Sequence, residues 1–86
     1  MSEPYNELMQ VKMAIKAAER MVGQATMSMD ENQLKAATDA VNEAKKQFQK
    51  ALLYETGVDH QFLEVSAELI EKIEHQLEQA KSNDEE

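Results

Sequence analysis

The sequence contains no cysteine, no tryptophan, one proline and two glycines. Without cysteine, the chain cannot form disulfides, thiolate zinc sites or iron–sulfur clusters, and it has no cysteine nucleophile. Aromatic residues make up only 5% of its 86 residues. The core must therefore be built from Leu, Ile, Val, Met and Ala, which suits close packing of helices.

Long apolar runs are also missing. No stretch approaches the ~18 consecutive apolar residues that a transmembrane helix needs. The first five residues have neither the basic region nor the apolar segment of a secretory signal. These features lead us to expect a soluble, cytoplasmic protein.

Basic residues are outnumbered, with 9 Lys and Arg against 17 Asp and Glu, for a net charge of −8. The excess lies at one end, because residues 1–25 are charge-neutral whereas residues 56–86 hold two lysines and nine carboxylates. Nucleic acids and anionic membranes are bound by basic patches. Direct binding to either is therefore disfavoured.

Three segments carry apolar or small residues at alternating steps of three and four, the period of one face of an α-helix. The stripes are Leu8, Val11, Ile15, Ala18, Val22, Ala25; then Leu34, Ala37, Val41, Ala44, Phe48, Ala51; and then Phe62, Ser66, Leu69, Ile73, Leu77, Ala80. With short connections, they predict an all-α, antiparallel up-down-up three-helix bundle. We expect one domain, 1–86, with helices at about 4–24, 29–55 and 60–81 and a frayed acidic tail at 82–86.

The first junction carries competing boundary signals. Gly23 suits either the residue that ends the first helix or a small residue inside it, and we favour an end between 23 and 27. Ser28 and Glu31 have the spacing of a capping box for the second helix. Asp30 is a competing cap.

The second junction carries a glycine and an aspartate. The middle helix is expected to end near Tyr54 or Glu55, with Gly57 as the residue that follows its C-terminus. Asp59 is expected to cap the third helix.

The sequence gives little support for a metal site or for catalytic residues. A di-metal bundle needs Glu-x-x-His pairs on inward positions, and neither histidine follows a glutamate at that spacing. Glu71 and His75 are one turn apart, as are His60 and Glu64, but both pairs face away from the apolar stripe. We expect ordinary surface pairs, with no metal site, no cofactor, no catalytic residues and no enzymatic activity.

The third helix is expected to carry an acidic stripe on its outer face. Such a stripe is either a solvated face that keeps the protein soluble or a docking surface for a basic partner. Its members are Glu64, Glu68, Glu71, Glu74 and Glu78.

Leu63, Ile70 and Leu77 form an apolar row, seven residues apart, that flanks the core stripe of the third helix. Met9 and Met13 likewise lie off the stripe of the first helix. A compact core could absorb such residues. The alternative is a second interface, for a homodimer or a partner helix. With the acidic stripe, the row forms our candidate partner surface.

Short segments resemble a known family. They are an alanine-rich helix ending in Gly-x-Ala-Thr (residues 13–26), an Asp-x-x-Phe cap (59–62) and Glu-His-Gln-Leu (74–77). This pattern is similar to a family of small helical proteins, a domain of unknown function, from spore-forming Gram-positive bacteria. The resemblance implies no catalytic motif and draws attention to His75.

We expect a non-enzymatic, cytoplasmic protein–protein interaction or regulatory module. The sequence does not identify its partner: a basic protein and a second copy of the chain are both candidates. The alternative is an acidic inhibitor or antitoxin-like protein that occupies a basic or nucleic-acid-binding site of its partner. Binding that is lost at high salt would indicate a contact through the acidic stripe, whereas binding that survives would indicate a contact through the apolar row.

Overall fold

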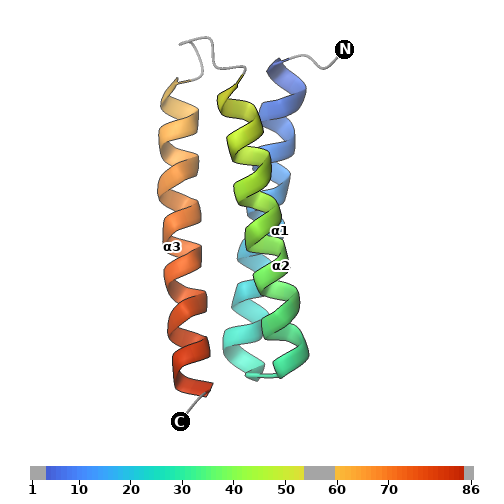
Figure 1. Cartoon of the computed structure of the whole chain (residues 1–86), viewed down its shortest axis with the longest axis vertical. Coiled ribbons are helices and arrows are strands. Elements are labelled where there is room, and N and C mark those ends of the chain that lie inside the picture. Colours follow the sequence, from blue (N-terminus) through green and yellow to red (C-terminus); the bar gives the residue numbers. More distant parts are fainter. Residues whose placement is uncertain (1–3, 54–59, 85–86) are drawn as a thin grey trace.

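The computed structural model describes residues 4–53 and 60–84, with side chains described for 8–53 and 60–82. Three helices make up the fold: α1 (Pro4–Ser28), α2 (Glu31–Leu52) and α3 (His60–Asp84) (Figure 1). α2 runs opposite to α1 and α3, and every pair of helices is in contact. The prediction of an all-α, antiparallel three-helix bundle is confirmed.

The predicted stripes of α1 and α2 form two sides of the core. From Val11 to Ala25, every stripe residue of α1 is buried, as is every stripe residue of α2 except Phe48. Leu8 and Phe48 are partly buried against the same cluster. Burying these side chains supplies the main free energy that holds the helices together, at about 25 cal/mol per Å² of apolar surface.

Small residues set the spacing between α1 and α2. Ala18 and Ala25 on α1, and Ala37 and Ala44 on α2, are each at most 1% exposed. A methyl group is the largest side chain at these positions, so the two backbones can approach closely. α3 contributes larger core residues, including Ile73 and Leu77, and lies beside this pair (Figure 1).

The apolar row of α3 is part of the core. Leu63, Ile70 and Leu77 are 3%, 7% and 3% exposed. The prediction that they form an accessible row outside the core is wrong. Since α3 packs on both α1 and α2, it buries a wider arc than one stripe. The first interpretation, that a compact core absorbs these residues, is confirmed.

The junction between α1 and α2 is tighter than predicted. Asp30, not Ser28, is the N-cap of α2: its carboxylate accepts a hydrogen bond of 2.8 Å from the backbone N–H of Asn32. Ser28 is the last residue of α1 and bonds to the Asp30 N–H and the Gln33 side chain. Between them, Met29 adopts the left-handed conformation, with φ of 57°, which reverses the chain in two residues.

Other boundaries also shift. Gly23 lies inside α1, which continues to Ser28. α2 ends at Leu52, earlier than expected, and α3 continues to Asp84, so residues 82–84 are helical and not a frayed tail. The predictions on Tyr54, Glu55, Gly57 and Asp59 lie outside the described residues.

Candidate functional site

The acidic stripe lies on the outer surface of α3, as predicted. Its members, here called the acidic face, are Glu64, Glu68, Glu71, Glu74 and Glu78; all are exposed except Glu74, which is half-buried. Core residues such as Ile73 and Leu77 occupy the opposite side of the helix. The burial of that side fixes the direction in which the carboxylates point.

Two of the five carboxylates have partners within the bundle. Glu74 accepts a hydrogen bond of 2.6 Å from the Lys45 ammonium of α2. His60 Nε2 lies 3.2 Å from a carboxylate oxygen of Glu64, one turn away on the exposed surface. Glu74 therefore helps to dock α3 onto α2, and Glu64 pairs locally.

The other three carboxylates have no partner of this kind. Glu68, Glu71 and Glu78 make no side-chain hydrogen bond or ion pair within the part of the chain that the structure describes. All three are solvent-exposed. Of the acidic face, these are the carboxylates that stay available to an external cation.

His75 lies on the exposed surface of α3. With Glu68, Glu71 and Lys72, it lines a shallow, open depression. Across the described ranges, 4–53 and 60–84, no group of three or more His, Asp or Glu side chains could hold a metal ion. Glu71–His75 and His60–Glu64 both lie on the surface, as their helical phase predicts.

Sequence reasoning missed a second charged surface, on α1. Lys12, Lys16 and Arg20 follow one another at steps of four and are all exposed. On the same side of the helix, Met9 comes one turn before Lys12 and Met13 lies between Lys12 and Lys16, with Met13 65% exposed. We call these five residues the basic face. The signal was present in the sequence as a four-residue period opposite the core stripe, but the neutral net charge of residues 1–25 obscured it.

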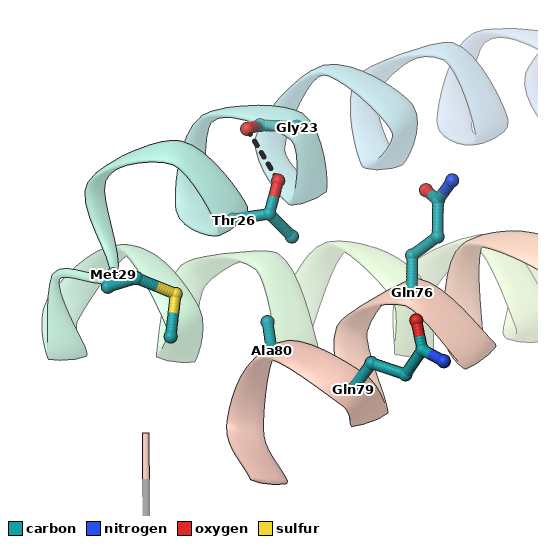
Figure 2. Close-up of a pocket in the computed structure, with 6 residues that line it drawn as sticks. All are labelled: Gly23, Thr26, Met29, Gln76, Gln79 and Ala80. Atoms are coloured by element: carbon teal, nitrogen blue, oxygen red, sulfur yellow. Dashed lines mark hydrogen bonds between the residues drawn. The ribbon is translucent and has the colours of Figure 1, made fainter. Parts of the chain in front are cut away.

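Between α1 and α3 lies an open hollow of about 420 Å³ (Figure 2). Gly23 and Thr26 line one side, and Gln76 and Gln79 line the other. The Thr26 hydroxyl donates a 2.9 Å hydrogen bond to the Gly23 carbonyl, shown dashed in Figure 2. A Cβ on Gly23 would meet nothing within 4 Å, so no contact within the described bundle requires glycine there.

These features define a small all-α bundle with oppositely charged faces on two of its helices. The chain belongs to the DUF2564 family of proteins of unknown function, whose family model matches residues 4–82. The match includes residues of all three helices and confirms the prediction of a family of unknown function. No curated protein and no solved structure matches the chain.

The helices can also be assessed for membrane insertion. Across the described residues, none is both long enough and apolar enough to cross a bilayer. The charged residues spaced along α1 and α3 account for this, because each polar or charged residue in the bilayer core is costly.

Proposed function

We propose that this chain is a non-enzymatic protein–protein interaction or regulatory module of the cytoplasm that binds a basic partner through the acidic face of α3. The observation that carries the proposal is that Glu68, Glu71 and Glu78 are exposed and have no partner within the described bundle. Like charges at helical spacings of three and four destabilise a helix. Folding therefore gains nothing from grouping these residues.

A charged face of this kind guides recognition as well as contact. Complementary potentials raise the rate of association with a cationic surface and disfavour partners of the wrong sign. We further propose that the partner is a protein of a spore-forming Gram-positive bacterium, which is what the resemblance of the short segments implies.

A second proposal uses the same carboxylates differently. An inhibitor or antitoxin-like protein would hold them in a basic or nucleic-acid-binding site of its partner. The roughly linear row along α3 favours this, because it presents negative charges at regular intervals, as a phosphate backbone does. A nucleic acid that competes with the chain for its partner would distinguish this role from simple docking.

Affinity capture on the immobilised chain tests the main proposal. Wild type, a Glu68→Gln/Glu71→Gln variant and a control Asp39→Asn/Glu43→Gln variant on α2 are compared at low and high salt. The control removes the same charge from another exposed surface. We expect a protein retained at low salt by wild type and control, and lost from the α3 variant. Equal retention by all three would contradict the proposal.

A further inference from the structure

The basic face of α1 is an exposed helix surface with features of an interface. Lys12, Lys16 and Arg20 make no side-chain hydrogen bond or ion pair among the residues that the structure describes. Met9 and Met13 expose apolar surface beside these cations. Methionine adapts its shape to irregular contacts, so it is frequent at binding surfaces.

The cations of α1 and the carboxylates of α3 match in spacing. Lys12 to Arg20 spans eight residues, or about 12 Å along a helix at 1.5 Å per residue. Glu64 to Glu71 spans seven residues, or about 10.5 Å. Both sets therefore present three charges over similar lengths, with opposite signs.

Apolar groups accompany the charges on both helices. Val65, 48% exposed, follows Glu64 on α3, and Met9 and Met13 accompany the cations on α1. A contact that joins the two faces would bury these side chains while pairing the charges. Burial of apolar surface supplies free energy that exposed ion pairs alone do not.

We propose that the basic face of α1 binds the acidic face of α3 of a second copy of this chain. The inference rests on the proposed function and names its partner: the cationic surface that the acidic face recognises is part of the same protein. Since every copy carries both faces, α1 of one copy pairs with α3 of the next.

Sedimentation equilibrium with charge reversal tests the proposal. Each copy has a net charge of −8, so copies repel at long range. At about 0.1 M salt the screening length is ~10 Å, which suppresses that repulsion more than contacts inside an interface. Wild type is expected to exceed the 9.8 kDa of one chain as concentration rises.

Two variants reverse the faces separately: Lys16→Glu/Arg20→Glu on α1 and Glu68→Lys/Glu71→Lys on α3. Each alone is expected to associate about tenfold more weakly than wild type, since each then opposes like charges. Mixed together, they are expected to regain association, because each supplies the sign that the other lost. A Lys35→Glu/Lys46→Glu control on α2 changes the net charge as the α1 variant does and should behave as wild type.

Two results would overturn the proposal. One is a wild-type mass of 9.8 kDa at all concentrations; the other is a mixture of the two variants that stays monomeric while wild type associates. Helicity by circular dichroism establishes that the variants fold, and Lys16→Gln/Arg20→Gln provides a milder change if either does not. If the chain does not self-associate, the proposed function still stands when affinity capture finds a different basic protein bound through Glu68 and Glu71.

Discussion

Lys45 of α2 and Glu74 of α3 form an ion pair 2.6 Å long that joins the two helices, with both side chains about half exposed. Exposed pairs of this kind contribute ~0.2–1 kcal/mol. We expect a double-mutant cycle with Lys45→Met and Glu74→Gln to give a coupling free energy in that range, decreasing with added salt. Denaturant unfolding measures it, and a coupling of zero at low salt would mean that the pair does not help to dock α3.

The burial of the apolar row predicts large costs for truncation. Leu77→Ala should lower the free energy of unfolding by ~2–5 kcal/mol, because it removes buried methyl groups and leaves a cavity. Ile70→Val should cost ~0.5–1.5 kcal/mol and keeps the test informative if the first variant does not fold. Val65→Ala, on the exposed part of the same helix, should cost less than about 0.5 kcal/mol. Equal, small losses of stability at all three positions would contradict the burial of the apolar row.

The cap of α2 can be tested at two neighbouring residues. Asp30→Ala should cost ~1 kcal/mol, because the Asn32 N–H loses its acceptor. Ser28→Ala should cost less, since Ser28 ends α1 and does not cap α2. Thermal unfolding compares the two, and a larger loss for Ser28→Ala would favour the capping box that the sequence suggested.

Gly23 offers a stabilising change. An alanine inside an exposed helix is more favourable than glycine by ~0.5–1 kcal/mol, and the added Cβ meets open space. Gly23→Ala should raise Tm by several degrees, at roughly 4–8 °C per kcal/mol for a domain of this size. A lower Tm would contradict the open space around Gly23.

The core stripes were predictable because burial follows the helical period. Val11, Ile15 and Val22 repeat at steps of three and four, and no proline or second glycine interrupts the helix that carries them. The period gives the direction of each side chain but not how many neighbours a helix has. Ile70 therefore looked peripheral, although it is buried in a helix that packs on two others.

Boundaries were harder to predict because several residues competed for one role. Ser28 and Asp30 are both good caps, and the choice depends on Met29 adopting positive φ, which is uncommon for a residue with a side chain. The acidic face was predictable from the helical spacing of its glutamates alone. Which of its carboxylates have partners could not be predicted, because the partner of Glu74 lies 29 residues away on another helix.

The most direct test of the central claim, that the acidic face of α3 is the binding surface, is mapping by amide chemical shifts. An isotope-labelled chain is titrated with the partner retained in affinity capture. We predict that the largest changes fall on the outer side of α3, around Glu68, Glu71 and Glu78. Changes confined to the outer side of α2, around Asp39 and Glu43, would contradict the account.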